Sequence, residues 1–148
     1  MLFSESPSLL LFSEEQKREK AVEWVSRMKK SFKDDGLGFF SCYLKNDNTF
    51  IGHCGILKRK FFDEDIFELG YAILRRFWNN GYATEAAGLC INFAFESLEL
   101  KSLSAFIEPG NTASILVAQK SGMAFKQEIF LENKNLRHFT ILNTDTIE

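Results

Sequence analysis

The stretch RRFWNNGYATEA, residues 75–86, contains the junction that decides the fold. It follows a strand-like run and leads into a helix-like run, and Gly81 and Ala83 keep the start of that helix free of bulky side chains. The first turn of a helix has backbone N–H groups without partners and carries a partial positive charge. The loop is therefore a candidate phosphate site, with amides supplied by Asn79, Asn80, Gly81, Tyr82, Ala83 and Thr84.

Spacing alone leaves two interpretations of this loop open, a phosphate site and an ordinary strand-to-helix turn. The chain contains neither G-x-x-x-x-G-K-[ST] nor G-x-G-x-x-G, so the two familiar phosphate loops are excluded. Asn79 and Asn80 belong to the few residue types besides glycine that tolerate left-handed backbone angles. A tight loop that brings its amides close to a ligand is therefore feasible.

Outward from this loop, hydrophobic periodicity predicts an alternation of strands and helices. Ala21, Val25, Met28 and Phe32 form an apolar stripe on the first helix, and the polar stretch 58–65 is expected to connect two strands. A strand, a helix and a strand in that order imply a parallel crossover. The predicted elements are a helix capped by the box Ser13–Gln16 and ended by 34–38, antiparallel strands at 39–44, 49–57 and 66–74, a helix at 84–98, a strand at 102–107, a short helix between Asn111 and Gly122, and strands at 125–131 and 137–142.

The composition bounds the function. The length of 148 residues predicts one domain, 1–148, and the net charge of −2 argues against a nucleic-acid partner. The apolar run 8–12 is too short to span a membrane. Three widely spaced cysteines predict a reducing, cytoplasmic location, and the distant His53 and His138 predict neither a metal site nor a catalytic cluster, so each is expected to be structural or exposed.

Two segments, ELGYAILRRFWNNGYATEA (68–86) and EPGNTASILVAQKSGMAF (108–125), resemble the signature segments of GNAT N-acetyltransferases. The closer resemblance is to the branch that includes ribosomal-protein N-terminal acetyltransferases, and it covers the chain from about residue 39 to the end. It implies an α/β (α+β) fold with a mixed, mainly antiparallel twisted sheet flanked by helices. This sheet is expected to splay open between the family's fourth and fifth strands.

The same resemblance implies that the domain binds acetyl-CoA in the splayed gap. The pantetheine arm would pair with the exposed backbone of the family's fourth strand, here the strand at 66–74. The pyrophosphate would lie on the loop amides, and no metal is expected. The implied cofactor-binding residues are Ala72, Ile73, Leu74, Asn79, Asn80, Gly81, Tyr82, Ala83, Thr84 and Asn111.

The chain departs from the family pattern at four places. Trp78 stands where many members have Gln or Arg, and Asn79 replaces a common Gly. Ala118 stands where many members carry a Tyr that is proposed to protonate the leaving thiolate, so a general acid must come from elsewhere or from water. The family's first strand and most of its first helix have no counterpart, so we expect either an upstream start or an open sheet edge that favours a homodimer.

Acetyl transfer to an amine requires a base, a polarised carbonyl and a protonated leaving group. Glu68 is the first candidate base, because it lies on the strand beside the cofactor, among apolar neighbours that would raise its pKa. A structural or solvated glutamate is the alternative, and Glu108 is a second candidate base. The N–H of Ile73 or Leu74 is expected to polarise the carbonyl. Arg75, Arg76 and Lys120 either hold cofactor phosphates or are solvated.

The sequence therefore predicts an N-acetyltransferase that moves an acetyl group from acetyl-CoA to a primary amine by direct attack in a ternary complex. The acceptor is a small-molecule or peptide amine whose identity the residues leave open. Two alternatives remain, a non-catalytic acyl-CoA-binding or regulatory domain and a subunit that is active only as an oligomer.

Overall fold

The structure is a computed structural model in which residues 12–144 are described. Most of the apolar run 8–12 and of the segment that precedes Ser13 lies outside these residues. The elements are α2 (Glu14–Asp35), β1 (Phe39–Tyr43), β2 (Phe50–Phe61), β3 (Glu64–Ile73), a 3-10 helix (Arg75–Phe77), α3 (Tyr82–Asn92), a π-helical turn (Phe93–Ser97), β4 (Ser102–Ile107), α4 (Thr112–Lys120), β5 (Ala124–Leu131) and β6 (Lys134–Leu142).

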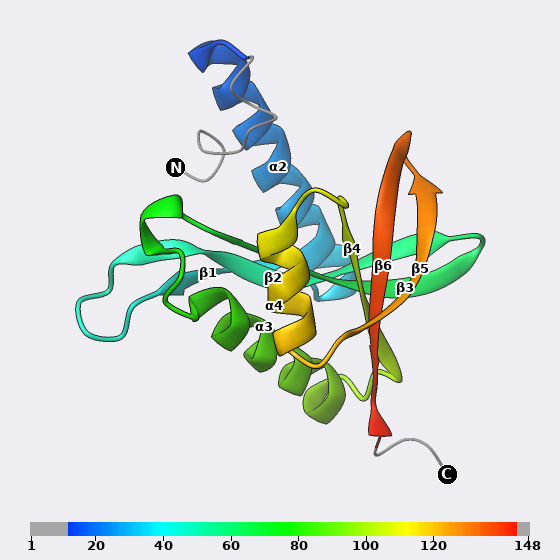
Figure 1. The fold of residues 1–148 in the computed structure, drawn as a ribbon. Helices are drawn as coiled ribbons and strands as arrows, with labels where there is room; N and C mark the ends of the chain where they lie inside the picture. Colours follow the sequence, from blue (N-terminus) through cyan, green and yellow to red (C-terminus); the bar gives the residue numbers. More distant parts are fainter. Residues whose placement is uncertain (1–11, 145–148) are drawn as a thin grey trace.

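Six strands form one sheet in the order β1-β2-β3-β4-β6-β5. Neighbouring strands are antiparallel except β3 and β4, which are parallel and are joined by the crossover through α3. The predicted fold class and the parallel crossover are therefore confirmed. The sheet is strongly twisted, so that β1, β2 and β3 run across the view of Figure 1 while β4, β6 and β5 run down it.

The helices cover both faces of the sheet (Figure 1). Helices α3 and α4 pack on one face, and α2 packs against β2 on the other. The apolar core lies mainly between the sheet and α3 and α4. Its buried members are Leu37, Cys54, Ile56, Leu69, Ala87, Ile91, Ala94, Leu103, Ala105, Ile107, Ala118, Met123 and Phe139.

Helix α2 starts and ends as predicted. The Ser13 Oγ accepts from the Gln16 N–H at 3.2 Å, the Gln16 Oε1 accepts from the Ser13 N–H at 2.9 Å, and Gly36 ends the helix with a left-handed φ of 68°. The predicted apolar stripe is only partly correct, because Met28 is buried but Val25 is 45% exposed.

The α2 helix contacts the sheet through aromatic rings. Trp24 lies 4.8 Å from the ring of His53, and Phe39 lies 5.1 Å from the same ring. Burial among these rings lowers the pKa of His53 to about 4, so the imidazole is neutral at pH 7. His53 is therefore structural, which is one of the two outcomes that the sequence predicts for it.

The stretch 58–65 is not the connecting loop that its polarity predicts. β2 continues to Phe61 and β3 begins at Glu64, so the turn consists of Phe62 and Asp63 alone, with φ values of 46° and 67°. Two left-handed central residues are typical of a tight hairpin turn. The charged side chains pair across the strands, as in the 3.0 Å contact of Lys58 with Asp65, which is why a polar run is compatible with two strands.

Helix α3 begins two residues before its predicted start and ends sooner. The α-helical ladder stops at Asn92, and the residues up to Ser97 form a wider π-helical turn. Its apolar face includes Ala87, Ile91 and Ala94, which are at most 6% exposed. Periodicity alone does not detect a π-turn, because the apolar spacing there is nearly the same.

The two halves of the sheet, β1-β2-β3 and β4-β6-β5, meet at a single register pair. The pair Glu68 and Ser104 is the one register pair between β3 and β4 in the described chain, whereas β2 and β3 share ten register pairs. The segment of β3 that follows Glu68 therefore has no strand partner on its β4 side. The predicted splay is confirmed here.

We predict that Gly55→Ala lowers the free energy of unfolding by about 1–3 kcal/mol, because the added Cβ would lie 2.0 Å from the backbone oxygen of Gly38. Gly88→Ala is the matched control, since nothing lies within 4 Å of its added Cβ and helix propensity favours Ala by about 1 kcal/mol. Urea unfolding midpoints measure both effects. Equal midpoints for the two variants would contradict this packing of β1 on β2.

Candidate active site

The loop between β3 and α3 has the tight conformation that its sequence predicts. Asn79 adopts a left-handed φ of 61° and Gly81, the N-cap of α3, adopts 81°. The first ladder bond of α3 from this cap is donated by the Glu85 N–H to the Gly81 carbonyl at 3.0 Å. The backbone N–H groups from Asn79 to Ala83 donate to no acceptor in the loops and turns of residues 12–144. They are therefore available to an anion.

Side chains hold this loop in shape. The Trp78 indole Nε1 donates to the Ile73 carbonyl at 2.7 Å, and the Asn80 Nδ2 donates to the carbonyls of Phe77 at 3.1 Å and Trp78 at 2.9 Å. Arg75 lies against the Trp78 ring, 6.0 Å from its centroid. Trp78, which departs from the general family pattern, thus ties the loop to the end of β3.

The end of β3 leaves one of the two predicted carbonyl-polarising groups available. The Leu74 N–H donates to the Ile51 carbonyl at 2.9 Å, so the prediction that it is free is wrong. Leu74 extends the ladder between β2 and β3, and donors alternate in direction along a strand. The Ile73 N–H therefore points to the side on which β3 has no strand partner.

Helix α4 is brought against β3 by a half-buried tyrosine. The Tyr71 hydroxyl donates to the Ser114 carbonyl at 2.7 Å, and burial raises the pKa of Tyr71 so that the phenol stays protonated. Asn111 caps α4 as predicted, since its Oδ1 accepts from the Ser114 N–H at 3.1 Å. Ala118 is completely buried. The end of β3, the loop and the start of α4 therefore surround the splayed gap.

Glu68 lies on the other face of β3. Its neighbour Leu69 belongs to the core beneath α3, and alternate side chains of a strand point to opposite faces. The Glu68 side chain is only 16% exposed, and its Oε2 lies 2.6 Å from the Arg59 Nε in an ion pair whose angle is not that of a hydrogen bond. Burial raises the pKa of Glu68, and Arg59 opposes that shift. Glu68 thus has the raised pKa that the sequence predicts.

Arg59 also joins the two halves of the sheet. Its Nη1 lies 3.4 Å from the Glu132 Oε1, and Glu132 belongs to the turn between β5 and β6. The second candidate base, Glu108, is exposed and forms an ion pair with Lys134 at 2.6 Å. Of the two candidate bases, Glu68 is therefore the less exposed.

Sequence reasoning missed a buried polar pair beside Glu68. The His138 Nε2 lies 2.8 Å from the Ser104 Oγ, and the two residues are 6% and 7% exposed. Ser104 is the register partner of Glu68 across the splay. The prediction of a structural or exposed histidine did not place His138 here, because 34 residues separate it from Ser104 and neither belongs to a motif.

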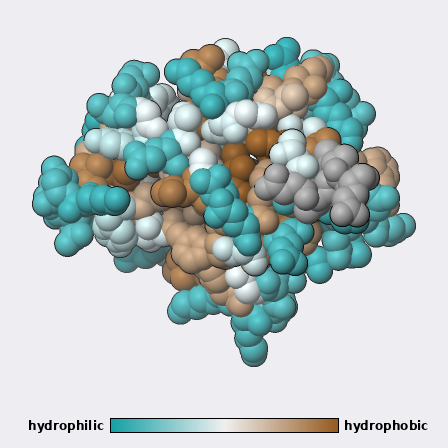
Figure 2. Space-filling view, turned by 90° about the horizontal axis from the view of Figure 1, so that it is seen from below, coloured by the Kyte–Doolittle hydropathy of each residue, from teal (hydrophilic) through white to brown (hydrophobic). Residues whose placement is uncertain are grey.

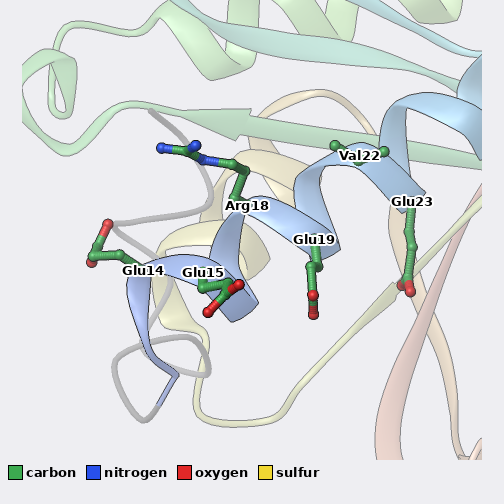
Figure 3. A pocket seen from close by; sticks show the side chains of 6 residues that line it. All are labelled: Glu14, Glu15, Arg18, Glu19, Val22 and Glu23. Carbon is green, nitrogen blue, oxygen red and sulfur yellow. The ribbon is translucent and has the colours of Figure 1, made fainter.

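A hollow of about 690 Å³ along the first turns of α2 lies apart from these groups (Figure 3). Arg18 points away from the carboxylates of Glu19 and Glu23 in this view. The described lining comes from one helix and shares no residue with the loop or with Glu68. It consists of Glu14, Glu15, Arg18, Glu19, Val22 and Glu23.

Within residues 12–144, no cluster of three or more His, Cys, Asp or Glu side chains is arranged to hold a metal ion. None of the helices described is both long enough and apolar enough to cross a membrane. The groups gathered at the splay are thus backbone amides, one carboxylate and the Ser104–His138 pair.

Comparison with known proteins agrees with this geometry. The family model described as acetyltransferase (GNAT) domain matches residues 4–124. The protein YkkB of Bacillus subtilis (strain 168) is 34% identical over 134 residues, which cover 90% of this chain and 78% of YkkB. The chain belongs to the GNAT acetyltransferase family.

Two solved structures share the fold. An acetyltransferase (GNAT family) from Bacillus anthracis has a TM-score of 0.69 and 27% identity, covering 96% of this chain and 85% of its own. A putative ribosomal-protein-serine acetyltransferase from Vibrio cholerae has a TM-score of 0.73 and 23% identity. This match covers 95% of this chain and 84% of the chain from Vibrio cholerae. GNAT domains use acetyl-CoA as co-substrate, and the chain is accordingly an acetyltransferase by family.

We predict a specific pH dependence of stability for Glu68→Gln. Because the folded-state pKa of Glu68 is raised, its stabilising contribution is complete below the unfolded value near 4.5 and is lost as the pH rises through the folded value. The variant has no proton to lose, so its stability relative to the wild type should increase from pH 4 upward and then level off. Urea unfolding at each pH measures the difference, and a difference that decreases with pH would contradict the raised pKa.

Proposed function

We propose that the protein is an N-acetyltransferase that moves an acetyl group from acetyl-CoA to a primary amine by direct attack in a ternary complex. The observation that carries this proposal is the run of free amides from Asn79 to Ala83, directly after a strand that is unpaired on one side. A diphosphate requires such donors, and an extended arm requires such a strand edge. All six strands of the described chain belong to one sheet, which supports a single domain.

The residues present fit acetyl-CoA. The amides of the loop, from Asn79 to Thr84, would hold the pyrophosphate, and Ala72, Ile73 and Leu74 would line the pantetheine arm. Asn111 lies at the start of α4, next to Tyr71 through Ser114, and its amide nitrogen would face the same arm. Arg75 and Arg76 are exposed at the loop, each against an aromatic ring.

When bound, acetyl-CoA supplies an activated acyl carbon. Glu68 takes a proton from the acceptor ammonium, directly or through a water, and its raised pKa makes it a stronger base for this task. The Ile73 N–H is placed to stabilise the negative charge that develops on the carbonyl oxygen. Because Ala118 has no proton to donate, water protonates the departing thiolate.

The acceptor is a small-molecule or peptide amine. The net charge of −2 gives no support to a nucleic-acid partner. The three cysteines are all free thiols, with the Cys54 and Cys90 sulfurs 3.4 Å apart, which supports a reducing, cytoplasmic location.

We predict that acetyl-CoA and free CoA each raise the melting temperature. Saturation at about 100 times the dissociation constant adds about 2.7 kcal/mol to the stability of the folded state. For a chain of this length that corresponds to a rise of several degrees, roughly 5 °C. Thermal melts with either ligand measure the shift, with adenosine, which lacks the diphosphate, as control. No shift with CoA or acetyl-CoA would contradict the cofactor site.

We further predict that Glu68→Gln lowers turnover about a hundredfold, since a general base contributes roughly 10²–10⁴ in rate. The thermal shift with acetyl-CoA should be retained, because Glu68 lies on the face opposite the core. Glu64→Gln is the matched control, an exposed glutamate at the start of the same strand. Thiol release with a panel of amines measures turnover, and unchanged turnover removes Glu68 from the mechanism.

An obligate oligomer is the second candidate, and the edge of the sheet favours it. β1 is the outer strand of the sheet, and a groove of about 590 Å³ lies between β1 and α3. Phe40, Tyr43, Leu89 and Phe93 along this groove are 40–65% exposed. Figure 2 shows apolar surface among hydrophilic groups on the face seen from below. A specific activity, per amount of protein, that increases with protein concentration would distinguish an active homodimer from an active monomer. Cofactor binding without acetyl transfer would indicate a non-catalytic domain.

A further inference from the structure

The Ser104–His138 pair is buried and incompletely bonded. His138 uses its Nε2 for Ser104, whereas its Nδ1 is buried with no hydrogen-bond partner in the described chain. A buried polar atom without a partner costs free energy, so it calls for an explanation such as a ligand. Like the loop amides and the Glu68 Oε2, the imidazole is therefore a group at the splay with a hydrogen-bonding capacity that the protein leaves unused.

The pair lies in one row with the candidate base. Ser104 is the register partner of Glu68, and it lies beside His138 on the face of β4 and β6 that is opposite the core residues Leu103 and Phe139. Glu68 also faces away from the core, as its neighbour Leu69 requires. The carboxylate, the hydroxyl and the imidazole thus share one face of the sheet. They lie at the closed end of the splay, which is the end where β3 and β4 still pair.

Aromatic rings flank this row. The Phe106 ring is 4.7 Å from His138, and the Phe61 ring is 5.9 Å from Phe106 and 6.4 Å from His138. Burial lowers the pKa of His138, an effect that Lys126 reinforces, so the imidazole is neutral. A neutral imidazole has one N–H and one bare nitrogen. If Nε2 carries the hydrogen and donates to Ser104, Nδ1 is the bare nitrogen and accepts from a ligand N–H.

We propose that the acceptor amine is held between Glu68 and the Ser104–His138 pair, with the His138 Nδ1 accepting one amine N–H. The aromatic flank selects a primary amine on an apolar or aromatic carbon framework. This inference rests on the proposed acetyl transfer and assigns its acceptor site.

The step balances with these groups. The acceptor ammonium loses one proton to the Glu68 carboxylate, and the neutral amine attacks the acetyl carbon. A C–N bond forms and the C–S bond breaks, and the nitrogen loses a second proton, which passes through water to the departing thiolate, so that the products are an amide and a neutral thiol. His138 stays neutral throughout, because it accepts a hydrogen bond and no proton. It is a catalytic residue in the sense that it touches the substrate, whereas Ser104 is a positioning residue that fixes the imidazole.

The two amide substitutions of His138 separate its two nitrogens. His138→Asn places a carbonyl oxygen near the Nδ1 position and loses the bond to Ser104, and His138→Gln retains the bond to Ser104 and loses the acceptor at Nδ1. With 2-phenylethylamine as acceptor, we expect His138→Gln to raise the KM for the amine roughly tenfold with a smaller change in kcat, and His138→Asn to raise it less. The reverse order would overturn the proposal, because it is the order that a purely structural bond to Ser104 requires.

Thr140→Val is the matched control. Thr140 is the register partner of Ser104 and has a hydroxyl that donates to the Leu103 carbonyl at 3.1 Å, so it is close to the site but already bonded. Its KM for the amine should stay within about twofold of the wild type. The thermal shift with acetyl-CoA should be retained in every variant, which shows that the variants are folded and bind the cofactor.

A spectroscopic measurement on the wild type tests the site without any turnover. The chain has two histidines, so the imidazole ¹⁵N spectrum of histidine-labelled protein contains two rings, and His53→Phe assigns them. We expect His138 to carry its hydrogen on Nε2 and its Nδ1 resonance to move when 2-phenylethylamine is added with CoA. A hydrogen on Nδ1, or no movement at a saturating concentration of the amine, would overturn the proposal.

Different results would contradict the proposed acetyl transfer and the proposed acceptor site. No thermal shift with acetyl-CoA and no thiol release with any amine would contradict the proposed acetyl transfer. A cofactor shift together with an unresponsive His138 would contradict only this acceptor site. Turnover of spermidine with no response to 2-phenylethylamine would refute the apolar class of acceptor.

Discussion

The register contact between Glu68 and Ser104 is the constraint on which the rest of the structure depends. It joins two antiparallel halves, β1-β2-β3 and β4-β6-β5, through one parallel pair. Further register pairs between β3 and β4 would close the gap between these strands, and the Ile73 N–H would then donate to a carbonyl within the sheet. Because pairing stops after one residue, the end of β3 keeps an unpaired edge next to the free amides of the α3 N-terminus.

The alternation of side chains along β3 then divides the chemistry between two faces. Tyr71 points to α4 and fixes the start of that helix, while Glu68 points away from the core. The proposed cofactor contacts are mainly backbone groups, and the proposed acceptor contacts are side chains. Substitutions of side chains on the Glu68 face can therefore alter the choice of amine while the backbone that binds the cofactor stays the same.

Local signals predicted much of this fold. The capping box of Ser13 and Gln16, the left-handed Gly36 and the Asn111 cap are each decided within a few residues, so the sequence contains the whole cause. The tight conformation of the loop at Asn79 and Gly81 was predicted in the same way, from local residue types. The raised pKa of Glu68 followed from its apolar neighbours, although the opposing ion pair with Arg59 did not.

The remaining features depend on partners that are distant in the sequence. The polar run 58–65 forms strands because its charges pair across a hairpin, and the Leu74 N–H is occupied because Ile51 lies opposite. His138 and Ser104 meet only once β4 and β6 pair. Each of these is decided by tertiary register, which neither periodicity nor spacing contains.

Arg59 links the two halves of the sheet across the splay. It reaches Glu68 in one half of the sheet and Glu132 in the other, so it bridges the two halves at their closed end. Glu132 is exposed, so its link to Arg59 is worth about 0–1 kcal/mol and is screened by salt. Rising ionic strength therefore weakens this link between the two halves of the sheet.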